Sequence, residues 1–274
     1  MTIRHSAIHQ PEILPLPAFQ DNYIWLLRVD KHAAVVDPGD AEVVEHHLAA
    51  HGLELSAILI THHHADHIGG VRALSSSRDI PVFGPAAEDI DGVTCGVIEG
   101  DQIELPELGV RFEVFEVPGH TRTHIAFYAA DGGEAEQPGG ILFPGDTLFS
   151  AGCGRLLGGT AEQLHASLQR LAALPGETRV YCTHEYTLAN LAFARIADPD
   201  NHERDAWLAE CKRLRARGQP TLPTRIALER RINPFLRTGE ASVIASVGTH
   251  HGQAVPDSLS CFTAMRAWKD VFRA

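Results

Sequence analysis

The chain has 274 residues and a formal net charge of −12, with 44% hydrophobic and 21% charged residues, a composition typical of a globular protein. The acidic charge argues against a nucleic-acid-binding protein, and an anionic small substrate would need a local basic patch. No stretch approaches the roughly 18 apolar residues of a transmembrane helix, and no signal peptide is recognisable, so we expect no membrane association. The five cysteines form neither a disulfide framework nor a zinc-binding CxxC pattern. We therefore expect a reduced, cytoplasmic protein.

Apolar patterning predicts an α/β domain followed by helices. Strands are expected at 22–29, 32–37, 57–61, 110–114, 125–130, 140–143 and 179–182. Helices are expected at 41–51, at 68–76, and after a capping-box sequence at 160–163. From residue 186 strand signals nearly vanish, and helices are expected at 187–196, 202–216 and 262–272. We therefore expect one domain at 1–185 and a smaller helical domain at 186–274.

A cluster of four histidines and one aspartate occupies residues 61–67, directly after the apolar run at 57–60. Buried polar groups are costly unless each finds a partner, and a metal ion can partner several at once. His62 and His64 share one side of an extended chain and can converge on one ion. Asp66 and His67 follow where the chain turns into a helix, so they can reach a second position. Four ligands exceed what one catalytic metal needs, which predicts two metals.

The same pattern of an apolar strand that leads to a histidine or aspartate occurs three more times. It places His120, Asp146 and His184 after the strands expected at 110–114, 140–143 and 179–182. Loops at strand ends hold ligands on a rigid frame. Zinc, iron and manganese all accept imidazole and carboxylate ligands, so the residues leave the metal open. We interpret His63 as facing away from the cluster, Cys153 as structural, and His124 as a candidate hydrogen-bond partner of the site.

These residues resemble the metallo-β-lactamase superfamily, whose H-x-H-x-D-H motif and later ligands they match in order. The resemblance implies an α/β fold, a four-layer αβ/βα sandwich with the metals at one edge, followed by a smaller C-terminal helical domain. It implies that His62, His64 and His120 bind a first metal and that Asp66, His67 and His184 bind a second. It also implies that Asp146 and a water or hydroxide bridge the two.

Further segments resemble the glyoxalase II family, in particular 118–121, 145–149, 152–155, 183–187, 190–194, 233–237 and 263–266. That resemblance implies metal-dependent hydrolysis of S-D-lactoylglutathione to D-lactate and glutathione by a metal-bridging hydroxide, the second step of methylglyoxal detoxification. It implies two divalent ions, most commonly zinc, with catalytic roles for Asp66 and Asp146. The chemistry is reasonable, because zinc lowers the pKa of bound water to about 7. A thiol leaving group with a pKa of about 8.5 needs little acid catalysis.

The resemblance also implies that Arg155, Tyr186 and Arg237 bind glutathione, so that the helical domain contributes to substrate binding. Arginine offers two parallel hydrogen bonds to a carboxylate. Leu157 departs from the family, which often has a substrate-contacting tyrosine there. The family's lysine shortly after Arg237 has no equivalent, since Thr238, Gly239 and Glu240 follow.

Three other functions remain open at this point. One is a persulfide dioxygenase of the same superfamily with a single iron. Another is a lactonase or β-lactamase, against which the motif at 233–237 argues. The third is a metal-binding module without enzymatic activity. We expect the protein to act as a monomer on a small glutathione thioester, without a nucleic-acid partner.

Overall fold

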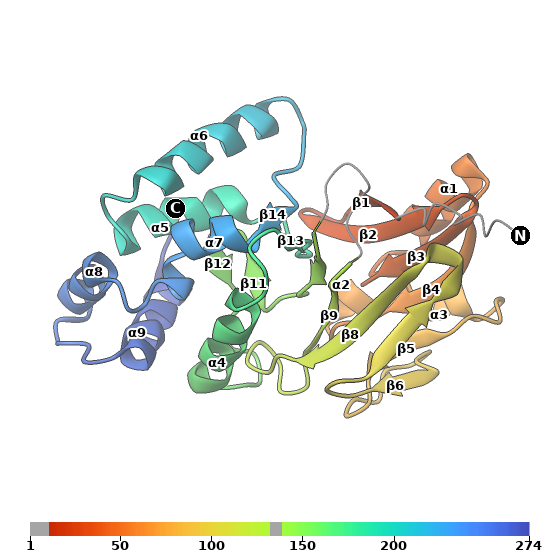
Figure 1. Ribbon diagram of the computed structural model, residues 1–274, viewed down its shortest axis with the longest axis horizontal. Helices are drawn as coiled ribbons and strands as arrows, with labels where there is room; N and C mark the ends of the chain where they lie inside the picture. The colour runs from red at the N-terminus through yellow and green to blue at the C-terminus, as the bar shows by residue number, and fades with distance from the viewer. Residues whose placement is uncertain (1–10, 132–138, 274) are drawn as a thin grey trace, which may run out of the picture. The chain divides into compact units, whose positions relative to one another are not determined.

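The computed structural model describes residues 11–131 and 139–273 (Figure 1). The described residues form two compact units. The first consists of those within Met1–Phe115 and Ile125–Phe143, and the second of those within Glu116–His124 and Pro144–Ala274. Both units contain residues from before residue 185, so the division into compact units differs from the domain boundary expected there. That boundary stays a prediction.

The first sheet of the first unit has the strand order β1-β2-β3-β4-β5-β6. β1, β2 and β3 are antiparallel neighbours, and β3 to β6 run parallel. The short polar link of Asp30 and Lys31 joins β2 to β3, as predicted. The strands are β1 (Glu12–Ala18), β2 (Asn22–Val29), β3 (His32–Val36), β4 (Glu54–Leu59), β5 (Val82–Pro85) and β6 (Cys95–Val97). The apolar segment before residue 20, for which we predicted no structure, is the edge strand β1.

Helix α1 (Ala41–His51) connects β3 to the parallel strand β4 and lies where the sequence predicts it. The Asp40 carboxylate caps its first turn by accepting from the backbone N–H groups of Glu42 and Val43. Val44 and Leu48 are buried in one cluster with residues of the first sheet. This packing fixes the end of β3 and the start of β4, which α1 joins by a crossover between parallel strands.

The helix predicted at 68–76 begins earlier and is interrupted. The chain becomes helical at α2 (Ala65–Ile68), breaks at Gly69 and Gly70, and resumes as α3 (Val71–Ser75). The break arises from a close backbone approach, since the Gly70 N–H donates to the Pro38 carbonyl over 2.9 Å. A Cβ on Gly70 would lie 2.5 Å from that oxygen. The predicted helix is thus interrupted at two glycines, which bring the segment at 61–67 against the turn after β3.

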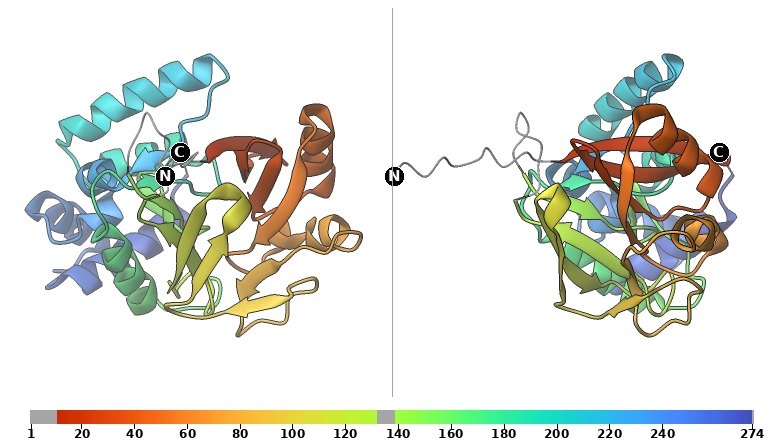
Figure 2. Two further views of the ribbon diagram at one scale, coloured as in Figure 1. Left: turned by 45° about the vertical axis from the view of Figure 1, so that its right-hand side comes forward. Right: turned by 90° about the vertical axis from the view of Figure 1, so that its right-hand side faces the viewer.

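The second sheet of this unit has the order β10-β9-β8-β7 (Figure 2). Phe112 contacts Phe127 and Phe143 across it, with ring centroids 6.5 Å and 5.8 Å apart. The strands are β7 (Gln102–Leu105), β8 (Val110–Glu116), β9 (Ile125–Ala129) and β10 (Ile141–Phe143), with a short 3-10 helix η1 (Pro106–Leu108) between the first two. The strands predicted at 110–114, 125–130 and 140–143 are confirmed within a few residues.

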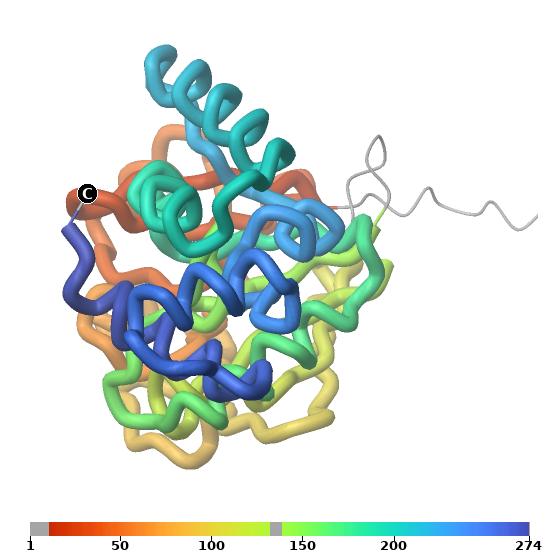
Figure 3. The backbone as a smooth tube through the Cα atoms, turned by 90° about the vertical axis from the view of Figure 1, so that its left-hand side faces the viewer, coloured from red at the N-terminus to blue at the C-terminus, as the bar shows by residue number. Residues whose placement is uncertain are grey.

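The second unit is mainly helical (Figure 3). It begins with a hairpin, β11 (Leu148–Phe149) and β12 (Gly152–Cys153), and with α4 (Ala161–Ala172), whose capping box of Thr160 and Gln163 is confirmed. A short strand pair, β13 (Arg179–Val180) and β14 (Thr224–Arg225), follows. The remaining helices are α5 (Thr187–Ala197), α6 (His202–Ala216), α7 (Ile226–Ile232), η2 (Pro234–Leu236), α8 (Ala241–His251) and α9 (Ser258–Val271). The sequence predicted α5, α6 and most of α9 but neither α7 nor α8.

Within residues 11–131 and 139–273, no helix combines the length and the apolar character needed to span a bilayer.

Gly39 provides a test of the close backbone packing around α2. A Cβ at this position would lie 1.9 Å from the Asp66 carbonyl oxygen. We expect Gly39→Ala to lower the free energy of unfolding by about 1–3 kcal/mol, because backbone atoms must shift to relieve the overlap. Thermal unfolding measures the effect. Gly239→Ala is the matched control, since no atom lies within 4 Å of its added Cβ. Equal stability of the two variants would contradict the prediction.

Candidate metal centre

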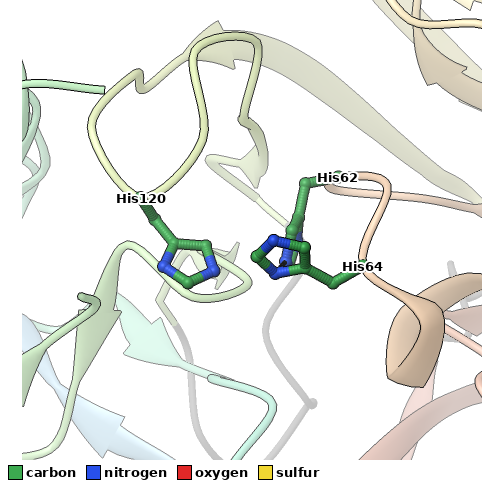
Figure 4. Close-up of side chains that lie close together, drawn as sticks. All are labelled: His62, His64 and His120. Carbon is green, nitrogen blue, oxygen red and sulfur yellow. Dashed lines mark hydrogen bonds between the residues drawn. The ribbon is translucent and has the colours of Figure 1, made fainter. Parts of the chain in front are cut away.

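The ligand segment of the first unit is anchored by Asp37, which lies directly after β3. Asp37 accepts hydrogen bonds from the Thr61 backbone N–H and hydroxyl, both over 2.8 Å. These bonds fix the chain where it leaves β4, just before His62. His62 is fully buried, and its Nε2 lies 3.0 Å from Nδ1 of His64. Figure 4 shows these two rings adjacent after β4 and, separately, His120 on the loop that leads to β9.

Asp66 and His67 lie on the single turn of α2, and His67 is fully buried. His67 Nε2 lies 3.6 Å from Asp66 Oδ2, and Nδ1 on the other side of the ring lies 3.0 Å from Asp37 Oδ2. The Asn22 amide donates to Asp66 Oδ2 over 3.0 Å. The first unit therefore orients all four of its predicted ligands by its own contacts. His63 is exposed and bonds to Glu88 over 2.8 Å.

The second unit brings His120, Asp146 and His184 together. His120 Nε2 lies 3.5 Å from Asp146 Oδ2, and His184 Nε2 lies 3.3 Å from Asp146 Oδ1. The Asp146 backbone N–H donates to Nε2 of the buried His124 over 3.1 Å. The His184 ring stacks on Tyr186 with centroids 4.6 Å apart. His124 thus holds the backbone of a predicted ligand.

The donor spacings within each unit suit metal binding. Two nitrogen ligands at about 2.0–2.1 Å from a tetrahedral ion lie roughly 3.3–3.4 Å apart. The separations are 3.0 Å for His62 and His64, 3.6 Å for His67 and Asp66, and 3.3 Å and 3.5 Å from Asp146 to the two histidines of its unit. The spacing of the donor atoms within each unit is therefore compatible with the binding of divalent metal ions.

The protonation of the histidines also suits metal binding. His120 Nδ1 lies 2.8 Å from the Arg155 carbonyl oxygen, and a carbonyl oxygen can only accept. The proton is therefore on Nδ1, and Nε2 presents its lone pair. Asp37 Oδ2 lies 3.0 Å from Nδ1 of His67, so its negative charge favours a proton on that nitrogen and a lone pair on Nε2. Such an oxygen partner on the nitrogen opposite the metal orients the ring and increases its basicity.

The three predicted substrate residues differ in their surroundings. Arg155 is exposed, and Tyr186 is half-buried beside His184. Arg237 forms an ion pair over 2.7 Å with Asp198, a carboxylate that is 1% exposed. Leu157, which replaces a family tyrosine, is 60% exposed. Arg237 is thus also a structural residue, whereas Arg155 presents its charge to solvent.

A thiol nucleophile is not favoured. Burial raises the pKa of the Cys153 thiol and that of Cys182, and both residues are buried. A buried thiol with a raised pKa is a poor nucleophile. This agrees with the interpretation of Cys153 as structural.

Sequence reasoning missed Asp37 and Asn22. Asp, Pro, Gly and Asp follow one another at 37–40, a typical turn sequence that accounts for Asp37 without a role at the site. Yet Asp37 follows an apolar strand in the same way as the predicted ligands do. That pattern was a usable signal for a group that contacts the site. Asn22 carries no such signal, since it begins a strand rather than ending one.

Two family models match the chain. The metallo-beta-lactamase superfamily model matches residues 19–184, and the model for the hydroxyacylglutathione hydrolase C-terminus matches residues 185–272. A hydroxyacylglutathione hydrolase from Cupriavidus taiwanensis is 54% identical over 96% of this chain and 99% of the relative. The chain belongs to the hydroxyacylglutathione hydrolase family. The αβ/βα fold class with a helical C-terminal part and the resemblance to glyoxalase II are thereby confirmed.

Solved structures with a similar fold cover most of the chain. ETHE1 from Myxococcus xanthus is 25% identical and has a TM-score of 0.59. The match covers 94% of this chain and 97% of that chain. TTHA1623 in a di-iron-bound form is 29% identical and has a TM-score of 0.55. The match covers 82% of this chain and 100% of that chain. The histidine and aspartate groups of this hydroxyacylglutathione hydrolase family member point to a dinuclear metal site.

Asp37→Asn tests whether the Asp37 carboxylate orients His67 for metal binding. The amide replaces one acceptor oxygen by a donor, so we expect affinity for zinc to fall about 10–100-fold. Competition with a chromophoric chelator measures the affinity. Asp40→Asn is the control, because Asp40 caps α1 in the same turn and asparagine caps a helix equally well. The same loss of affinity in both variants, or no loss in Asp37→Asn, would argue against this role.

Proposed function

We propose that this protein hydrolyses S-D-lactoylglutathione, and other S-2-hydroxyacylglutathiones, to the free hydroxy acid and glutathione. The observation that carries the proposal is the match of both the ligand-bearing part and the C-terminal helices to hydroxyacylglutathione hydrolases. The reaction would be the second step of methylglyoxal detoxification. Persulfide dioxygenase and lactonase activities are not favoured, because the curated relatives over nearly the full chain carry the hydrolase name.

We infer that the ligands of both units hold two divalent ions. By their motif positions, His62, His64 and His120 would hold one ion, Asp66, His67 and His184 would hold the other, and Asp146 would contribute to both. We propose zinc, although iron and manganese accept the same ligands.

When bound, the two ions supply a water of lowered pKa and a Lewis acid for the thioester carbonyl. The residues of the chain orient the reactants. Asp66, whose Oδ2 accepts from the Asn22 amide, would orient the attacking water through its carboxylate. Asp146 is held by the bond from its backbone N–H to His124. The departing thiol, with a pKa of about 8.5, leaves as a thiolate without a dedicated acid.

The substrate contacts proposed for Arg155, Tyr186 and Arg237 follow from their motif positions. The exposed Arg155 offers a planar guanidinium to a glutathione carboxylate. Tyr186 is placed beside a metal ligand by its stacking on His184. Arg237 would act on substrate while its Nε bonds to Asp198, which leaves its terminal nitrogens for a second partner.

We also propose a catalytic domain at 1–185 and a helical substrate-binding domain at 186–274. The two family matches, which meet between residues 184 and 185, support this division. Five free cysteines support a reducing compartment, for which we propose the cytoplasm. We propose that the protein acts as a monomer.

Thioester hydrolysis should depend on the metals. Zinc-loaded protein should cleave S-D-lactoylglutathione, and a chelator should abolish cleavage. Asp146→Ala should lower kcat by about 100-fold or more, since metal-bound groups contribute several kcal/mol to the transition state. Asp91→Ala, which removes a surface carboxylate that is 70% exposed, should keep wild-type activity. A metal-loaded wild type that leaves the thioester intact would refute the substrate, and full activity of Asp146→Ala would refute the dimetal mechanism.

The two arginines should be separable by experiment. Arg155→Ala should raise KM about tenfold or more without loss of stability, because a hydrogen bond to a charged group contributes about 1.5–3 kcal/mol. Arg237→Ala should raise KM and also lower the free energy of unfolding, since it leaves the buried Asp198 without its cation. Steady-state kinetics and thermal unfolding measure both effects, with the exposed Arg213→Ala as control. Either arginine whose loss leaves KM unchanged does not bind the substrate.

A further inference from the structure

The hairpin formed by β11 and β12 is buried along its whole length. Phe149, Ser150 and Ala151 are each at most 4% exposed. Ala151 has a φ of 55°, in the left-handed region that non-glycine residues adopt at a cost. Buried backbone groups need hydrogen-bond partners, and this tip has few neighbours in regular sheet pairing. The hairpin therefore depends on side chains from elsewhere for its shape.

Side chains from helical segments far along the sequence supply these partners. The Ala151 N–H donates to Glu229 Oε2 over 2.8 Å. The Asn233 amide donates to the Phe149 carbonyl over 3.2 Å and to the Gly152 carbonyl over 2.9 Å. Asn233 also donates to Glu229 over 3.1 Å, so the two side chains act as one unit. Together, Glu229 and Asn233 bind the backbone on both sides of the strained residue.

Glu229 is an unusual choice for a buried position. Its side chain is fully buried, and burial raises its pKa to about 7 in spite of the hydrogen bonds it accepts. A buried carboxyl group costs free energy that an apolar side chain would not. A carboxylate does, however, accept several donors at once, here from Ala151, Asn233 and Thr224. The polar group is thus placed where the hairpin needs an acceptor.

The hairpin in turn contacts the proposed metal ligands of the second unit. The Phe149 ring packs edge-on against His184, with centroids 5.8 Å apart, and against Tyr186 at 5.4 Å. Asp146 lies two residues before β11. On the other side of the hairpin the chain reaches Arg155, whose carbonyl holds His120 Nδ1. A shift of the hairpin would therefore move all three ligands of this unit.

We propose that Glu229 and Asn233 are positioning residues, which set the geometry of His120, Asp146 and His184 by clamping the hairpin of β11 and β12. The proposal rests on the proposed metal-dependent function. It assigns the C-terminal helical segment a second role besides substrate binding, namely to hold metal ligands that lie up to about a hundred residues earlier.

The test compares Glu229→Leu, Glu229→Gln and Asn233→Ala with Val247→Ala in the full chain. Val247 is a core residue of α8 that is 1% exposed, so its truncation lowers stability without removing a hairpin hydrogen bond. Three quantities are measured on each variant: the melting temperature with chelator present, zinc affinity and stoichiometry by chelator competition, and kcat with KM at saturating zinc. All binding and kinetic measurements are made well below the melting temperature, where circular dichroism shows folded protein.

Glu229→Leu and Asn233→Ala should lose at least about tenfold in zinc affinity and in kcat, as expected when groups that orient metal ligands are removed. Val247→Ala should keep both at a similarly lowered melting temperature. Glu229→Gln should stay within about threefold of wild type, because its amide oxygen can accept from Ala151 while its amide nitrogen donates to the Thr224 hydroxyl.

Three results would refute the proposal that Glu229 and Asn233 clamp the hairpin. They are wild-type zinc affinity in folded Glu229→Leu or Asn233→Ala, an equal loss in Val247→Ala, and a loss of tenfold or more in Glu229→Gln. If Glu229→Leu does not fold, Asn233→Ala and Glu229→Gln still decide the matter. Zinc affinity is independent of the substrate, so wild-type protein that fails to hydrolyse the thioester refutes the proposed function while the affinity comparison still tests the clamp.

Discussion

The proposed centre depends on an oxygen atom that lies close to one ring nitrogen of a histidine, on the side facing away from the proposed metal position. Asp37 plays this part for His67, and the Arg155 carbonyl plays it for His120. A free imidazole can rotate and can carry its proton on either nitrogen. These oxygens remove both freedoms, so lone pairs point into the site before any ion arrives. Since the oxygens belong to buried or backbone groups, the fold itself creates the affinity for a metal.

The two units hold their proposed metal ligands in place by different structural means. In the first, two proposed ligands follow a parallel strand and two lie on a one-turn helix, and a single buried carboxylate fixes the segment. In the second, ligands lie on loops around a short hairpin, which has little regular structure of its own. Helices from the C-terminal part therefore provide the rigidity there, through side chains such as Glu229. A segment that we propose to contact the substrate thus also contributes to the arrangement of the proposed metal ligands.

The sequence could point to candidate ligands because ligand chemistry is local. An apolar strand that ends in histidine or aspartate is visible without a structure, and it led to His62, His120 and their companions. Contacts between residues that are far apart in the sequence have no comparable local pattern. The pairing of Arg237 with Asp198 joins residues 39 positions apart, and Asp37 was hidden because its neighbours also form a good turn. Helices α7 and α8 were missed because one is short and lies between prolines, and the other carries a weak apolar face.

The glycines at 39, 69 and 70 bring two stretches of main chain into direct contact, with no side chain between them. The position of the first ligand segment is consequently set by peptide groups as well as by the Asp37 carboxylate. Evolution, or a protein engineer, can therefore vary the residues that face a substrate without disturbing the ligands. Such freedom to change specificity while the metal site stays constant would suit a scaffold shared by enzymes as different as β-lactamases and thioesterases.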